Sequence, residues 1–313
     1  MPLPDLLESK LTIPAIAAPM FIVSQPELVV AECKAGIVGA FPSLNARPSG
    51  VFEDWLIRLR RDLTDQDTPF AVNLIVHKTN ARLQEDLALC VKYQVPIVIT
   101  SLGANPDVND AIHGYGGFVF HDVINDEFAH KAIARGADGL IAVAAGAGGH
   151  AGTLSPFALV QEIRQWFSGP LALSGAIANG QAIAAARAMG ADLAYIGSAF
   201  IATQEANAAP AYKQMVVDSA AKDIVYANYF TGVFGNYLMP SIVAAGLDPA
   251  VLTNGAPAKM EWGQADEGRK AWRDIWGAGQ GIGGVKEIVP VASLVARLKA
   301  EYQAALRALT AAP

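Results

Sequence analysis

Residues 139–200 read GLIAVAAGAGGHAGTLSPFALVQEIRQWFSGPLALSGAIANGQAIAAARAMGADLAYIGSAF. Three short apolar runs alternate in this stretch with two amphipathic segments, at residues 156–167 and 181–189. Near-continuous apolar strands joined by helices are typical of a parallel sheet that helices cover on both faces. The stretch therefore predicts successive strand–helix units.

The same alternation extends upstream, where amphipathic segments lie at residues 26–35, 51–63, 80–93, 106–113 and 127–135. Eight strand–helix units predict a (β/α)₈ TIM barrel, and a doubly wound open sheet is the alternative. In a barrel, chemically active residues follow the ends of the strands, so the residues after each run are the candidates for a site. The eight runs begin near Ile13, Ile37, Phe70, Ile97, Gly117, Gly139, Leu171 and Leu193.

The last hundred residues follow a different pattern. Residues 210–275 are helical and irregular, with an aromatic-rich turn at residues 226–232, and residues 291–309 form one long amphipathic segment. We expect residues 1–209 and 276–313 to make the barrel, with the last helix packing back on it. Residues 210–275 are expected to form a small, mainly helical second domain over the barrel mouth, covering the substrate.

Composition excludes several classes of protein. Of 313 residues, 52% are hydrophobic and 17% charged, and the net charge of −6 disfavours nucleic acid as a partner. The sequence contains no run of about 18 apolar residues, so it predicts no membrane span. The start MPLPDLLESK lacks the pattern of a signal peptide, and we therefore expect a cytoplasmic protein. Cys33 and Cys90 are expected to be buried thiols, and no Cys, His or acidic cluster has metal-ligand spacing.

A glycine-rich run, Ala144-Ala-Gly-Ala-Gly-Gly-His150-Ala-Gly152, follows the sixth strand. It loosely fits a dinucleotide-binding fingerprint, but the next helix begins only near Pro156 and Trp166 stands near the expected acidic position. The alternative is a flexible backbone that a ligand approaches closely, with His150 at its rim. A lone histidine is often structural, but the glycine run at a strand end favours a functional role for His150.

Two further turns follow the seventh and eighth strands. They read Ser174-Gly175-Ala176-Ile177 and Gly197-Ser198-Ala199. Singly, each is an ordinary tight turn. Together, backbone amides and a short helix start at these two positions predict the phosphate site that is common in barrels.

Three weaker signals leave two interpretations open. Ala18-Pro19-Met20 and Asn73 follow the first and third strands, where they would either face a planar heteroaromatic ring or serve as turn and core residues. The segment Gly279-Gln280-Gly281 is either a loop or a ligand contact.

This ordered set of motifs resembles the nitronate monooxygenase family, formerly called 2-nitropropane dioxygenases, over nearly the whole chain. The resemblance implies an FMN bound without a covalent link, its phosphate at strands seven and eight, and His150 above a small-molecule substrate that dioxygen oxidises. It implies oxidation of alkyl nitronates, and of nitroalkanes, to a carbonyl compound and nitrite. The alternative is an NAD(P)H:quinone reductase or an enoyl-acyl-carrier-protein reductase-like flavin enzyme.

The expected reaction gives roles to individual residues. His150, with an ordinary pKa of about 6.5, would bind the nitronate or remove the α-proton of a nitroalkane. Tyr229 and Phe230 would bind substrate and exclude water. Whether the chain forms a homo-oligomer stays open. The FMN contacts would be Ala18, Pro19, Met20, Asn73, His121, Gly148, Gly149, Ser174, Gly175, Ala176, Gly197, Ser198 and Gln280.

This chain departs from the family pattern at four of its motif positions. Gly146 replaces a frequent glutamate, Ala176 replaces the second of two glycines, and Ser198 replaces a threonine. At the fifth strand His121 stands where some relatives carry lysine. We expect the phosphate site to tolerate these changes, because backbone amides make it and serine keeps the hydroxyl.

Overall fold

Eight parallel strands close into a barrel in this computed structural model, which describes residues 5–48, 50–230, 232–252 and 275–311. The strands pair in the order β1-β9-β8-β6-β5-β4-β3-β2, and a parallel bridge from Ile16 of β1 to Val38, two residues before β2, closes the barrel. All eight predicted strands are confirmed. They are β1 (Ala15–Ala17), β2 (Ala40–Pro42), β3 (Ala71–Ile75), β4 (Ile97–Ser101), β5 (Phe118–Val123), β6 (Gly139–Val143), β8 (Leu171–Ser174) and β9 (Leu193–Ile196).

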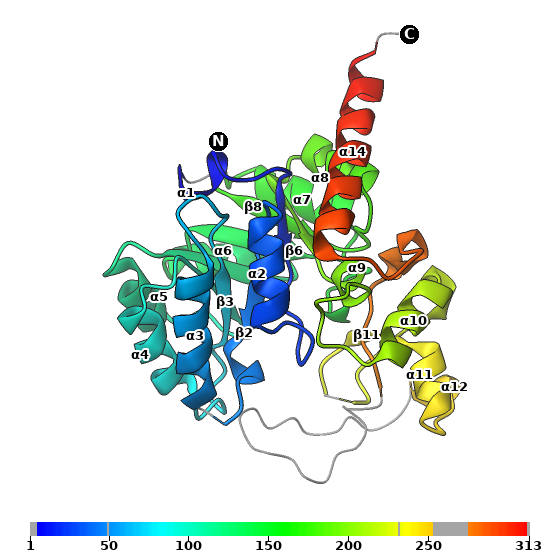
Figure 1. Ribbon diagram of the computed structural model, residues 1–313, viewed down its shortest axis with the longest axis horizontal. Coiled ribbons are helices and arrows are strands. Elements are labelled where there is room, and N and C mark those ends of the chain that lie inside the picture. The colour runs from blue at the N-terminus through cyan, green and yellow to red at the C-terminus, as the bar shows by residue number, and fades with distance from the viewer. Residues whose placement is uncertain (1–4, 49, 231, 253–274, 312–313) are drawn as a thin grey trace.

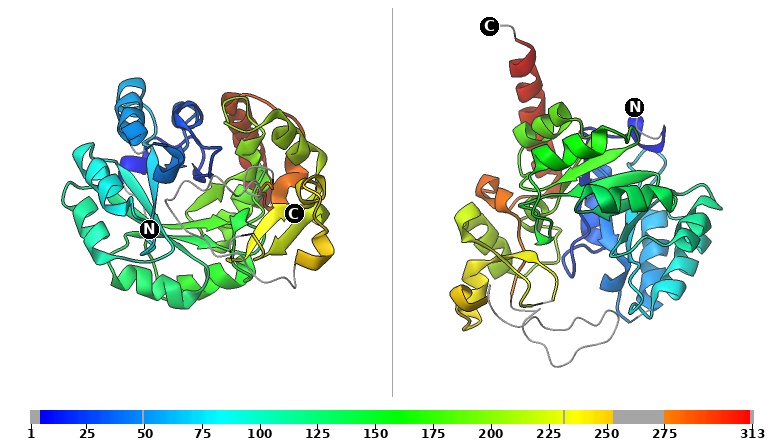
Figure 2. Two further views of the ribbon diagram at one scale, coloured as in Figure 1. Left: turned by 90° about the horizontal axis from the view of Figure 1, so that it is seen from below. Right: turned by 180° about the vertical axis from the view of Figure 1, so that it is seen from behind.

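Helices surround the strands (Figure 2). Several begin at an asparagine whose side-chain oxygen accepts a hydrogen bond from a first-turn N–H: Asn105, Asn125 and Asn179. The barrel helices are α2 (Pro26–Lys34), α3 (Gly50–Asp62), α4 (Leu83–Lys92), α5 (Pro106–His113), α6 (Asp126–Ala134), α7 (Pro156–Arg164), α8 (Gly180–Met189) and α14 (Val291–Thr310). The remaining ones are α1 (Asp5–Glu8), η1 (Ser43–Asn45), α9 (Ser198–Ile201), α10 (Pro210–Asp218), η2 (Ala221–Asp223), α11 (Met239–Ala244), α12 (Pro249–Leu252) and η3 (Gln280–Gly284).

The last helix packs back on the barrel, as predicted. Helix α14 packs between α8 and α2, and Figure 1 shows it beside α8. Its buried face consists of Val291, Leu294, Val295 and Leu298. This helix thus takes the place of the eighth barrel helix, although about ninety residues separate it from β9.

The barrel interior decides which side chains reach the mouth. Its core contains at least one inward residue from each strand and includes Leu7 of α1. Because side chains alternate along a strand, the residue two positions later points inward at the carboxyl end. The inward core residues are Ile16, Ala40, Ala71, Ile99, Phe120, Ile141, Ala172 and Leu193.

Residues 210–275 contain strands that the sequence did not predict. β10 (Ile224–Ala227) pairs antiparallel with β11 (Gly235–Leu238), and β11 pairs antiparallel with β7 (Gly149–His150). The described part of this segment still contains more helix than strand, in α10, η2, α11 and α12, but the sequence did not predict the sheet. A satellite apolar cluster around Ala227, Phe230 and Tyr237 supports the hairpin. A separate domain at 210–275 stays a prediction, because residues 253–274 lie outside the described residues.

Two smaller expectations can be compared with the structure. Cys33 and Cys90 are both buried free thiols, as predicted, and burial raises the pKa of each. Among the helices in the described part of the chain, none is both long enough and apolar enough to cross a membrane.

Candidate functional site

A pocket lies where the glycine-rich turns after β6, β8 and β9 meet. It is lined almost entirely by small residues and main chain, and Tyr195 is the one large polar side chain in the lining. Six of the predicted cofactor residues lie here: Gly148, Ser174, Gly175, Ala176, Gly197 and Ser198. The other lining residues are Gly146, Ala147, Ile177, Tyr195, Gly279 and Gly281.

The turns approach so closely that side chains would not fit between them. Gly175 has φ +140°, and a Cβ there would lie 2.8 Å from the carbonyl oxygen of Ala145. A Cβ on Gly148 would lie 2.8 Å from the amide nitrogen of Gly279. Glycine is required at both positions, and it leaves the main chain facing the pocket.

Residues 279–281 form the fourth wall, which the sequence left open as a loop or a contact. The hydroxyl of Ser198 accepts a hydrogen bond from the Gly279 N–H at 2.8 Å, and the Gln280 N–H donates to the Gly146 carbonyl at 2.9 Å. The Gln280 side chain itself is exposed and does not line the pocket. Its contribution is therefore through the backbone, which holds the wall in place.

The lining of this pocket has the chemistry of an anion site. Helix α9 begins at Ser198, and the N–H groups in the first turn of a helix have no intrahelical acceptor. Such a helix start, surrounded by turns without side chains, is a recurrent phosphate site. The lining contains no acidic side chain that would repel a phosphate.

The loop after β1 lies against the same pocket. A Cβ on Gly197 would be 3.5 Å from the Ala18 Cβ and 3.6 Å from the Met20 sulfur. Asn45 fixes this loop, because its side-chain nitrogen donates to the carbonyls of Met20 and Ser24 at 2.9 and 2.8 Å. Met20 is thus held beside the turn after β9, and its contact with a cofactor stays a prediction.

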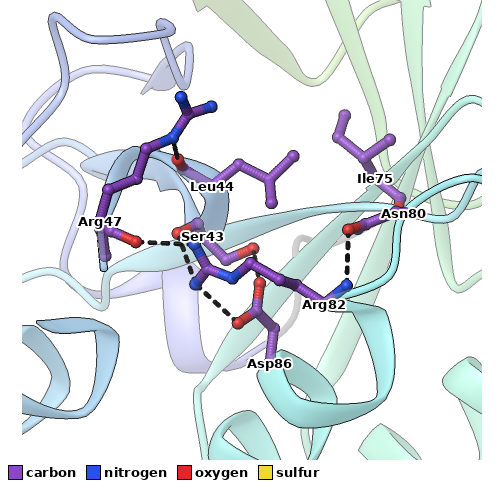
Figure 3. A network of polar contacts seen from close by, with 8 residues as sticks. Ser43, Leu44, Arg47, Ile75, Asn80, Arg82 and Asp86 are labelled. Carbon is purple, nitrogen blue, oxygen red and sulfur yellow. Dashed lines mark hydrogen bonds and ion pairs between the residues drawn. The ribbon is translucent and has the colours of Figure 1, made fainter. Parts of the chain in front are cut away.

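A polar network anchors η1, which carries Asn45 (Figure 3). Ser43 donates a hydrogen bond to the buried carboxylate of Asp86 at 2.7 Å, and Arg82 pairs with the other oxygen at 2.9 Å. Arg82 also donates to the Ala46 carbonyl at 2.7 Å. The network ties the loops after β2 and β3 together and so supports the Met20 loop indirectly.

A second polar chain lies inside the barrel. Asn73 on β3 donates to the hydroxyl of Ser101 on β4 at 2.7 Å, and this hydroxyl donates to Asp122 Oδ2 on β5 at 2.5 Å. Asn73 follows the inward Ala71 by two residues, and Asp122 follows Phe120 in the same way. These three hydrogen-bonded side chains therefore lie on the inner face of the barrel, at the carboxyl ends of three neighbouring strands.

Burial sets the charge state of the hydrogen-bonded side chains at these strand ends. Desolvation raises the pKa of Asp122 to about 6, although the Ser101 hydrogen bond partly opposes the rise. Burial and the negative charge of Asp122 hold the pKa of Tyr195 well above its ordinary value, so this phenol stays neutral. A partly protonated carboxyl is thus near the pocket wall that Tyr195 forms.

His150 lies on β7, opposite Gly235 of β11, and only two residues after Gly148 of the pocket. Asn236 of β11 also donates to the Ala147 carbonyl at 2.6 Å, which fixes the glycine loop. The half-buried imidazole has its pKa lowered to about 4 by desolvation. The expectation of an ordinary pKa near 6.5 is therefore wrong, and His150 is neutral at pH 7.

The prediction of a cofactor contact for His121 is not supported. His121 follows the outward Val119 by two residues, and its Nδ1 forms a hydrogen bond of 2.6 Å with Thr100 Oγ1. Its side chain is thus on the outer face of β5, buried, with a pKa lowered to about 4. The inward residue at this strand end is Asp122.

The aromatic residues near His150 also differ from those expected. Phe230 is buried in the satellite cluster against Tyr237, and Tyr229 packs on the same cluster, so neither is shown to cover the site. Instead, Tyr226 and the exposed Phe234 stack with ring centroids 5.0 Å apart. The Tyr226 hydroxyl donates to the Ala151 carbonyl at 3.0 Å, which places this pair beside the His150 strand.

Comparisons with known proteins agree with this arrangement. Residues 81–301 match the family model for nitronate monooxygenase. The chain is 26% identical to the nitronate monooxygenase of Paraburkholderia phytofirmans, over 95% of this chain and 94% of that protein. It is 30% identical to that of Pseudomonas aeruginosa, over 64% and 69%.

The fold also matches a solved structure over the whole chain. Nitroalkane oxidase from Streptomyces ansochromogenes superposes with a TM-score of 0.83 at 25% identity, covering 97% of this chain and 100% of that one. The family match includes the turns after β6, β8 and β9 that make the pocket. This chain belongs to the nitronate monooxygenase family.

Proposed function

We propose that this protein binds FMN and uses dioxygen to oxidise alkyl nitronates to a carbonyl compound and nitrite. The observation that carries the proposal is the single loop after β6. Its first part, Gly146–Gly148, lines the pocket, and its last residue, His150, stands two positions beyond it. One short loop thus brings an anion site and a neutral imidazole together.

We propose FMN rather than FAD as the cofactor. The glycines at positions 148, 175 and 281 admit no Cβ, so main-chain groups surround a space suited to one terminal phosphate. Ser198 and the start of α9 would hold that phosphate, with Met20 and Asn73 on the side of the ring. When bound, the flavin would accept electrons from the substrate and transfer them to dioxygen.

The state of His150 favours nitronates over neutral nitroalkanes. A neutral imidazole has one N–H donor, which suits the negatively charged oxygens of a nitronate. A base with a pKa of about 4 removes carbon-bound protons poorly, so a nitroalkane would have to ionise before binding. We therefore assign His150 to holding the anion.

The Tyr226–Phe234 pair would shield the substrate from water. Phe234 is 46% exposed and lies next to Gly235, which faces His150 across the sheet. Ile124 is also exposed and lies close to Gly152 of the same loop. These apolar side chains would contact the alkyl group of a bound nitronate.

The test compares two reactions of the purified, FMN-loaded protein. Dioxygen consumption is measured with ethyl nitronate and with nitroethane, and flavin bleaching is measured anaerobically with NADH and NADPH. We expect rapid consumption with the nitronate, slow consumption with nitroethane and little bleaching. Fast bleaching by a nicotinamide without nitronate turnover would favour a reductase, and release of FAD on heat denaturation would contradict the cofactor.

A further inference from the structure

Asp122 is a carboxyl to which the proposed reaction gives no role. Its Oδ2 accepts the Ser101 hydrogen bond, but its Oδ1 is buried without a hydrogen-bond partner among the described residues. In the same part of the chain, no salt bridge to Asp122 is formed. A buried carboxylate oxygen without a donor is unfavourable, so this atom lacks one hydrogen bond.

The neighbouring groups cannot supply that donor by turning. The Asn73 amide donates both to the Ile99 carbonyl and to Ser101, and the single hydroxyl proton of Ser101 is used on Asp122. Hydrogen bonds are thus donated in one direction, from Asn73 on β3 to Ser101 on β4 and from Ser101 to the Asp122 carboxylate on β5. Because Asp122 lies on the inner face at the carboxyl end of β5, a molecule bound in the barrel mouth would be placed to supply the missing donor.

We propose that the Asp122 carboxylate accepts the imide N–H of the bound flavin ring, so that flavin affinity depends on the ionisation of this side chain. The inference rests on the proposed flavin cofactor. An oxidised isoalloxazine ring has one N–H donor, and its other ring heteroatoms and carbonyls accept. An ionised carboxylate, which only accepts, is complementary to that one donor.

Neighbouring titratable groups do not obscure this dependence. Tyr195, which faces Asp122 from β9, is neutral, and His121 and His150 are both neutral above pH 5 because burial lowers each pKa to about 4. The pKa of Asp122 is about 6, so about one tenth of the carboxyl is ionised at pH 5. Flavin should bind about tenfold more weakly at pH 5 than at pH 7.5.

The experiment uses riboflavin, because the FMN phosphate itself titrates near pH 6. Binding to the full chain freed of flavin is measured between pH 5 and 8 by quenching of riboflavin fluorescence, with the melting temperature recorded at each pH. We expect affinity to fall about tenfold toward pH 5. 3-Methylriboflavin lacks the imide hydrogen, so it should bind more weakly at pH 7.5 and show no such fall.

Three variants test the residue itself. Asp122→Asn should weaken riboflavin binding at pH 7.5 and flatten the profile. Ser101→Ala removes a hydrogen bond to the carboxylate, so the midpoint should move to higher pH, which a purely structural role would not produce. His121→Gln, a neighbouring substitution on the outer face of β5, should leave the profile unchanged.

The possible failures are distinguishable. Tight riboflavin binding with the same pH profile in the wild type and in Asp122→Asn would overturn this inference alone. A fall of equal size with 3-methylriboflavin would also overturn it. Failure of the folded wild-type chain to bind any flavin would contradict the proposed function as well.

Discussion

Replacing Gly175 by alanine should weaken FMN binding without unfolding the barrel. The residue has φ +140°, a conformation that costs a side-chain-bearing residue about 1–3 kcal/mol. The new Cβ would also lie 2.8 Å from the Ala145 carbonyl, a backbone atom, so the turn itself must shift. If the shift breaks one charge-assisted contact with the phosphate, about 1.5–3 kcal/mol of binding is lost, or about 10- to 150-fold in Kd.

The assay measures FMN affinity by fluorescence quenching and stability by thermal unfolding monitored by circular dichroism. Gly116→Ala is the matched control, since Gly116 has φ +84°, lies on the exposed turn before β5 and has open space around its Cβ position. We expect the control to lose about 1 kcal/mol of stability and no FMN affinity. Wild-type affinity in a folded Gly175→Ala protein would place the phosphate elsewhere and refute the argument.

Four further results are expected. Ala176→Gly should raise stability by up to about 1 kcal/mol in urea unfolding, because Ala176 has φ +55°, and FMN affinity should be retained. His150→Ala should lower kcat/KM for ethyl nitronate about 10- to 150-fold at unchanged flavin content, since a hydrogen bond to a charged group is lost. Phe234→Ala should lower kcat/KM for hexyl nitronate more than for ethyl nitronate, by up to about fourfold per buried methylene. Glu32 is buried, and desolvation and Glu205 raise its pKa well above the ordinary value, so the folded state holds the proton and stability falls as pH rises above about 4.5. Glu32→Gln should make that fall smaller in urea midpoints measured from pH 5 to 8, and Asp122 accounts for part of the remainder.

The barrel strands were predictable because each is buried on both faces. Such strands read as short apolar runs, and the glycines and prolines between them mark the ends of the helices. β7 gives no such signal, since it is two residues long and exists only through pairing with β11, more than eighty residues later. Strands that depend on distant pairing leave no local period in the sequence.

The site was predictable where the backbone makes it and less so where side chains do. Glycine at the end of a strand marks a tight turn or a close approach to the backbone, so Gly148 and Gly175 were correctly placed at one pocket. In β5, Phe-Val-Phe-His-Asp-Val is apolar on both faces, so its sequence does not show whether His121 or Asp122 points inward. A shift of one residue exchanges the two faces, and this accounts for the wrong residue at that position.

The most direct test of the proposed function is the appearance of nitrite. FMN-loaded protein is mixed anaerobically with ethyl nitronate, oxygenated buffer is then added, and nitrite is determined before and after the addition. We expect nitrite to form catalytically only when FMN, nitronate and dioxygen are all present, with the rate unaffected by added NADH or NADPH. Absence of nitrite under these conditions, from a protein that retains its FMN, would contradict nitronate oxidation as its function.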